Sequence, residues 1–114
     1  MKDVKDLAVD ILKKQKYKDG QYAYISAYQL AVLMYKEDAT IFSSLKANHL
    51  GGKGTGEHAS WAQYLAGNLE HKNIERSFFN ISELEKFSFN DEKGILREAS
   101  NESFSIFKYK DNAI

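Results

Sequence analysis

HLGGKGTGEHASWAQYLAGNLEHKNI, residues 49–74, is the stretch that decides the fold. It joins a glycine-rich segment (residues 51–56) to a run with helical periodicity (residues 57–71) and then enters extended sequence at Ile74. Four glycines within six residues predict a loop, because glycine adopts backbone conformations that other residues avoid. The apolar side chains that follow recur at helical spacing, so we expect an amphipathic helix over residues 57–71.

The expected helix has an apolar side and a polar side. Glu57 stands in its first turn, where a negative charge suits the positive end of the helix dipole. On a helical wheel, the side that should face the core carries His58, Trp61, Ala62, Leu65, Ala66 and Leu69. The outward side carries Ser60, Gln63, Tyr64, Gly67 and His71, with Asn68 and Glu70 beside it.

Helical and short extended patterns alternate in the N-terminal half. Ser26 followed by Gln29 fits a capping box, which places the start of a second helix there, and this helix is apolar on nearly every side. The expected elements are an amphipathic helix over residues 3–16, a turn at Asp19 and Gly20, an edge strand over residues 21–25, the buried helix over residues 26–35 and one further helical turn within residues 39–45.

The C-terminal third has a β-like pattern. Residues 103–110 form the clearest expected strand, and we expect it to pair antiparallel with residues 74–79. Between these strands, residues 87–89 alternate, residues 90–94 carry turn chemistry and residues 95–96 return as a strand, which together predict a hairpin. Residues 111–114 are expected to form a loose tail.

Length and composition predict one globular domain over residues 1–114. Hydrophobic residues make up 43 % of the chain and aromatic residues 13 %, which is typical of a packed core rich in rings. The absence of cysteine excludes disulfides, thiolate catalysis and cysteine-type zinc sites. Without an apolar run near 18 residues or a signal-peptide pattern, we expect a cytoplasmic protein with no membrane partner.

The charges balance, with sixteen basic and sixteen acidic residues. This balance argues against a strongly basic nucleic-acid protein, although a local basic face is enough for DNA binding. Four lysines that crowd the end of the first expected helix are typical of a solvated helix end, and could contact phosphate if that end faced a duplex: Lys13, Lys14, Lys16 and Lys18.

A resemblance adds to these patterns. From Ala62 to Ile74, a helix of the form L-A-x-x-L-E-x-K passes into N-I-E-R, as a recognition helix passes into the first wing strand of winged helix-turn-helix proteins. The order helix, short strand, helix, helix, strand, hairpin, strand also resembles that superfamily. The resemblance implies an α+β fold with three helices and a small antiparallel β-sheet or wing in the C-terminal third.

The resemblance further implies a non-enzymatic regulator of bacterial or mobile-element type that binds duplex DNA, as a homodimer because one short helix makes few contacts. The helix over residues 57–71 is implied to lie in the major groove, with base contacts from Ser60, Gln63, Tyr64, Gly67, Asn68 and His71. Phosphate contacts are implied for the glycine-rich loop and the flanking cations, namely Lys53, Gly54, Thr55, Lys72 and Arg76.

Sharper chemical sites do not fit the sequence. In a nucleotide-binding loop, Lys53 would be followed directly by Ser or Thr, but here Gly54 follows it. The spacing of the three histidines matches no metal-ligand pattern, so we expect no metal and no cofactor. The carboxylates show no acid–base pairing, and no serine stands in a nucleophile elbow. The sequence therefore favours a protein that is not an enzyme.

Two other functions remain open from the sequence. The zero net charge and the neutral, aromatic-rich helix also fit a small protein-interaction module or an inhibitor of another macromolecule. A nuclease or other enzyme fragment, with its catalytic part elsewhere, is the third possibility.

Overall fold

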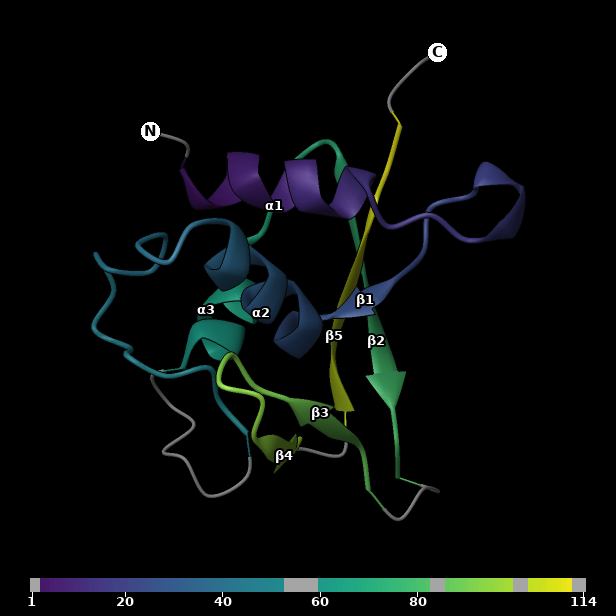
Figure 1. Cartoon of the computed structure of the whole chain (residues 1–114). Helices are drawn as coiled ribbons and strands as arrows, with labels where there is room; N and C mark the ends of the chain where they lie inside the picture. Colours follow the sequence, from purple (N-terminus) through teal and green to yellow (C-terminus); the bar gives the residue numbers. More distant parts are fainter. Residues whose placement is uncertain (1–2, 53–59, 83–85, 100–102, 112–114) are drawn as a thin grey trace.

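The computed structural model describes residues 3–52, 60–82, 86–99 and 103–111. It is an α+β fold in which three helices pack against a small antiparallel sheet (Figure 1). The elements in chain order are α1 (Val4–Lys13), the 3-10 turn η1 (Lys18–Gly20), β1 (Ile25–Ser26), α2 (Ala27–Glu37), α3 (Trp61–Asn68), β2 (Ile74–Asn80), β3 (Ser88–Asn90), β4 (Leu96–Glu98) and β5 (Ser103–Tyr109). Within the described residues, every helix is too short or too polar to cross a lipid bilayer.

The first two helices begin where their capping residues predict. The side chain of Asp3 accepts a hydrogen bond from the backbone N–H of Asp6 at 2.8 Å, which starts α1. The capping box of α2 is confirmed: Ser26 Oγ accepts from the Gln29 N–H at 3.1 Å, and Gln29 Oε1 accepts from the Ser26 N–H at 2.8 Å. These bonds satisfy N–H groups that a helix start would otherwise leave unpaired.

The main sheet has the strand order β1–β5–β2. The predicted antiparallel pairing of the two long strands is confirmed, with Ile74 opposite Tyr109 and Asn80 opposite Ser103. Of the expected edge strand over residues 21–25, only Ile25 joins β5, together with Ser26, which follows it. Residues 15–23 instead form backbone hydrogen bonds within their own segment. The Tyr17 N–H donates to the Gln21 carbonyl at 2.6 Å, and the Ala23 N–H donates to the Gln15 carbonyl at 2.7 Å.

One apolar cluster lies between the helices and the sheet. Phe107 at the centre of β5 is fully buried, as is Leu65 of α3. Trp61 is in this core, as predicted, stacked between the rings of Tyr35 at 5.1 Å and Phe42 at 4.9 Å. Residues 39–45 form turns and not the expected helical turn, yet Phe42 still points inward.

The hairpin β3–β4 is separate from the main sheet and lies against α2 (Figure 1). The ring of Phe89 in β3 stacks on Tyr28 of α2, with centroids 4.2 Å apart. In the turn between β3 and β4, the buried carboxylate of Asp91 accepts bonds from the N–H groups of Lys93 and Ile95, both at 2.9 Å, and from Arg97 Nε at 3.0 Å. The hairpin is thus docked on the body of the molecule.

Candidate nucleic-acid interface

The helix α3 is shorter than the sequence predicts. It begins at Trp61, because Ser60 has extended backbone and its Oγ accepts from the Gln63 N–H at 3.1 Å. The N–H groups of Trp61 and Ala62 bond to the carbonyls of His49 and Leu50, each at 3.0 Å. The expected start at Glu57 is therefore wrong, since the capping residue stands at position 60.

The predicted end of α3 at His71 is also wrong. The last helical residue is Asn68, whose side-chain amide donates to the Tyr64 carbonyl at 2.9 Å and so bonds one of the carbonyls that the helix end leaves unpaired. His71 belongs to the turn that follows, where its Nδ1 accepts from the Asn73 N–H at 3.0 Å and its carbonyl accepts from the Ile74 N–H at 3.1 Å.

The structure divides the expected base-contact residues into three groups. Gln63, Gly67 and Asn68 are exposed on α3, on the outward side where the wheel places them. Tyr64 and His71 are half-buried. The expectation for Ser60 is wrong: only 4 % of it is exposed, because the bond that caps the helix holds it against the body.

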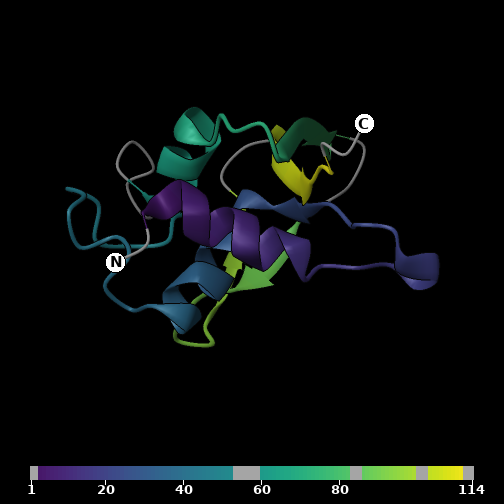
Figure 2. The same ribbon diagram turned by 90° about the horizontal axis from the view of Figure 1, so that it is seen from above.

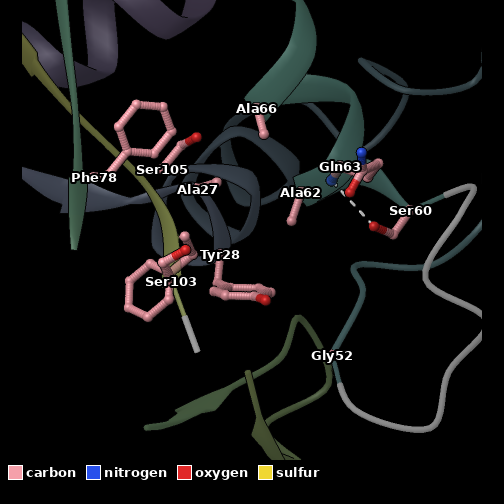
Figure 3. A pocket seen from close by; sticks show the side chains of 11 residues that line it. Ala27, Tyr28, Gly52, Ser60, Ala62, Gln63, Ala66, Phe78, Ser103 and Ser105 are labelled. Atoms are coloured by element: carbon pink, nitrogen blue, oxygen red, sulfur yellow. Dashed lines mark hydrogen bonds between the residues drawn. The ribbon is translucent and has the colours of Figure 1, made fainter. Parts of the chain in front are cut away.

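A cavity of about 150 Å³ lies beside the inner edge of α3 (Figure 3). Gln63 and Ala66 line it from α3, Tyr28 from α2, and Phe78 and Ser105 from the sheet. The Phe78 ring covers one side of the opening, yet 67 % of Phe78 is exposed. Gln63 therefore borders both the solvent-facing side of the helix and a shallow recess between helix and sheet.

Of the expected phosphate contacts, two cations lie within the described residues. Lys72 is exposed in the turn after α3. Arg76 in β2 is exposed, but its guanidinium already has partners within the chain. It donates to the Ala66 carbonyl and lies 5.7 Å from the centre of the Phe107 ring. Arg76 thus ties β2 to α3. Lys53, Gly54 and Thr55 lie outside the described residues, as do Glu57 and His58.

The first two glycines of the 51–56 segment serve packing. Gly51 and Gly52 are buried and have φ values of 119° and 116°, where a side chain is strained. A Cβ at Gly51 would stand 2.9 Å from Ser60 Oγ, and one at Gly52 would stand 3.1 Å from the Glu98 carbonyl oxygen. This part of the segment lets the chain pass closely between the start of α3 and the docked hairpin, so it does not form the expected solvent-facing phosphate loop.

The described histidines do not assemble a metal centre. No group of three or more His, Asp and Glu side chains that could hold an ion occurs within the described ranges. His49 lines a polar recess with Asp91 and Arg97, and its Nε2 is buried without a hydrogen-bond partner among the described residues. The Asp91 carboxylate already forms an ion pair with Arg97 within the hairpin turn.

The pKa values of two hydrogen-bonded carboxylates, Asp91 and Glu75, are lowered. Burial acts to raise the pKa of Asp91, but the N–H of Ile95, the Arg97 side chain and the N–H of Lys93 together outweigh it and lower the pKa. On the sheet, the hydroxyl of Tyr24 donates to Glu75, which lowers the pKa of Glu75 and raises the pKa of Tyr24 to about 12. The sequence patterns pointed to neither pair: Tyr24 and Glu75 are distant in sequence, and the turn chemistry of residues 90–94 does not by itself show that Asp91 also bonds Arg97.

Comparison of the chain with protein-family models, with characterised proteins and with solved structures found no match. The geometry of the described residues is therefore the basis for assigning a function.

Proposed function

We propose that the chain is a cytoplasmic, non-enzymatic regulator that binds duplex DNA, as a homodimer, through a winged-helix-like unit in which α3 is the recognition helix. The observation that carries the proposal is the order of the elements, α1–β1–α2–α3–β2–hairpin–β5. This order resembles that of winged helix-turn-helix proteins. The sheet supports it further, because β5 pairs with both the strand before α2 and the strand after α3.

The exposed face of α3 supports the assignment of the recognition helix. Its side chains are neutral and polar, and the primary amide of Gln63 can bond an adenine edge through two hydrogen bonds. The amide of Asn68 is already used within the helix, so it is a weaker candidate. Lys72, in the turn after the helix, provides an exposed cation for the DNA backbone.

Gly67 gives independent support. A glycine inside a helix lowers stability by about 1 kcal/mol relative to alanine. A Cβ built at this position meets no described atom within 4 Å, so packing within the described chain does not require glycine. Gly67 is exposed and faces away from the core. Close approach of an external partner to the helix backbone is a physical reason for a residue without a side chain at this position.

Selection of binding sites from a randomised duplex library at low salt tests the proposal. We expect a preferred sequence to be enriched, and Gln63→Ala should relax the preference at one base pair by about 1–3 kcal/mol. Gly67→Ala should weaken binding although it makes the helix more stable. The matched control is Ser43→Ala, an exposed polar position remote from α3 in sequence, which should bind like the wild type. A library in which no sequence is enriched would overturn the proposal.

A protein-interaction module is the second candidate, favoured by large apolar side chains that are mostly exposed. Phe78 is 67 % exposed and Leu96 68 % exposed, and such side chains mark protein contacts when they gather. In this case the purified chain should recover one stoichiometric protein partner in the absence of nucleic acid. Phe78→Ser should abolish that recovery, while Gln63→Ala should leave it intact.

A further inference from the structure

Residues 14–24 form a finger that projects from the body of the molecule. In two views at right angles it leaves the end of α1, turns and returns to β1 away from the rest of the fold (Figures 1 and 2). The backbones of Lys16 and Tyr22 form an antiparallel β-bridge. The backbone hydrogen bond from the Tyr17 N–H to the Gln21 carbonyl closes the finger near its tip. At the tip, Asp19 has a φ of 68°, the left-handed conformation of a tight turn.

The finger and the neighbouring end of β5 concentrate positive charge. We call residues 13–24 and 107–111 the basic end; it contains six lysines, against only Asp19 and Asp111. The chain as a whole is neutral, so the rest of it carries the excess of acids. The lysines of the basic end are Lys13, Lys14, Lys16, Lys18, Lys108 and Lys110.

Tyrosine rings position three of these ammonium groups. Lys13 Nζ lies 5.6 Å from the centre of the Tyr109 ring, Lys16 Nζ 5.4 Å from Tyr22 and Lys108 Nζ 5.0 Å from Tyr24. Tyr22 and Tyr109 also meet edge to face, with centroids 4.7 Å apart. Cation–π contacts of this kind hold the lysines without neutralising them.

Carboxylates offset only part of this charge. Glu75 in β2 lies 3.8 Å from Lys108 Nζ and also accepts from Tyr24. Asp10 and Asp111 make interactions of their own nearby. Lys16 and Lys18 are exposed, and both belong to the finger.

We propose that the basic end is a sequence-independent contact for the phosphate backbone of duplex DNA, separate from the face of α3. The inference rests on the proposed function for the choice of DNA. Closely spaced lysines match a phosphate backbone, whose binding releases counterions. Membrane-surface segments pair lysines with Trp, Phe or Leu, whereas the finger has none of these and exposes Tyr17 as its largest ring.

The test is the salt dependence of binding to a random-sequence duplex, measured by fluorescence anisotropy. The variant is Lys16→Gln, Lys18→Gln and Lys110→Gln combined, and its charge-matched control is Lys5→Gln, Lys36→Gln and Lys46→Gln, all exposed elsewhere. The basic-end variant should bind at least tenfold more weakly at low salt, and its slope of log K against log salt should flatten by about 2 to 3. The control should stay within about twofold of the wild type.

The two proposals fail in different ways. A basic-end variant with wild-type affinity and slope overturns this inference, while sequence preference through Gln63 can still stand. If the basic-end variant loses binding but Gln63→Ala and Gly67→Ala change nothing, the recognition-helix proposal fails and the basic end stands.

Two further arms complete the design. The single substitution Lys18→Gln at the exposed tip should flatten the slope by about 1, which keeps the test valid if the triple variant folds poorly. Vesicles of phosphatidylcholine with about 30 % phosphatidylserine serve as the other polyanionic surface. Binding of the wild type to these vesicles, together with no binding to the duplex, would overturn the inference.

Discussion

Gly51 and Gly67 stand in opposite steric situations. Gly51 has a positive φ, and an added Cβ would collide with the Ser60 side chain, whereas Gly67 is helical and borders open space. Gly51→Ala should therefore lower the free energy of unfolding by more than about 1 kcal/mol, and Gly67→Ala should raise it by about 0.5–1 kcal/mol. Urea denaturation measures both, and equal signs for the two changes would contradict this account.

Asp91 is the residue that organises the β3–β4 turn. Its buried carboxylate accepts two backbone N–H bonds and the Arg97 bond, so Asp91→Ala would leave three part-buried donors without this acceptor. We expect a loss of about 2–3 kcal/mol in the free energy of unfolding. Faster amide exchange at Lys93 and Ile95 should accompany it. Unchanged exchange at these amides would show that the carboxylate does not hold the turn.

At the scale of elements, the docking of the hairpin depends on one aromatic stack. Phe89 is buried against Tyr28, so Phe89→Ala should remove about 3–5 kcal/mol of local packing. The hairpin should then exchange its amides quickly, while the β2–β5 pairing keeps its protection. Phe78→Ala is the matched control, because Phe78 is mostly exposed and its loss should change stability by less than about 0.5 kcal/mol. Equal loss of protection in β2 and β5 would mean that the hairpin is part of the main cooperative unit.

Local patterns predicted the elements whose causes are local. The capping box at Ser26 and the alternation along β5 are short-range signals, and both the start of α2 and the pairing of β5 with β2 followed from them. The start of α3 did not follow from helical periodicity: it is set by the Ser60 cap and by the backbone of residues 49–50, which supplies partners for the first N–H groups. The docking of the hairpin is equally non-local, since it joins residues about sixty positions apart.

The same distinction applies to the candidate site. A helical wheel placed Gln63 and Gly67 outward correctly, but it gave Ser60 the same side and could not show that capping buries it. The lysines before residue 20 looked like a solvated helix end. Only the fold shows that Lys14, Lys16 and Lys18 lie on a projecting finger and that Lys13 contacts Tyr109, the neighbour of Lys108 and Lys110 in sequence.

At the scale of the whole molecule, net neutrality conceals an uneven distribution of charge. The basic end holds six of the sixteen basic residues in seventeen positions, with two of the sixteen acids. The remaining surface is therefore acidic on balance. This distribution favours an approach to a polyanion with the basic end first, so charge biases the orientation of binding before any base is contacted.

The dependence of stability on pH follows from Asp91 in the hairpin turn and from the Tyr24–Glu75 pair at the main sheet. The pKa values of Asp91 and Glu75 are lowered in the folded chain, so their contribution is present above the ordinary values of 3.8 and 4.5 and is lost as pH falls through the folded values. The pKa of Tyr24 is raised from 10.0 to about 12, so its contribution is complete below pH 10 and is lost as pH rises toward 12. Urea denaturation at a series of pH values should give a free energy of unfolding that falls at acid pH and at alkaline pH. Tyr24→Phe should flatten the alkaline fall and also part of the acid fall, because Glu75 loses the bond that lowers its pKa, whereas Asp91→Asn should flatten the acid fall alone. A Tyr24→Phe profile that still falls as steeply above pH 10 would show that the bond to Glu75 does not stabilise the sheet.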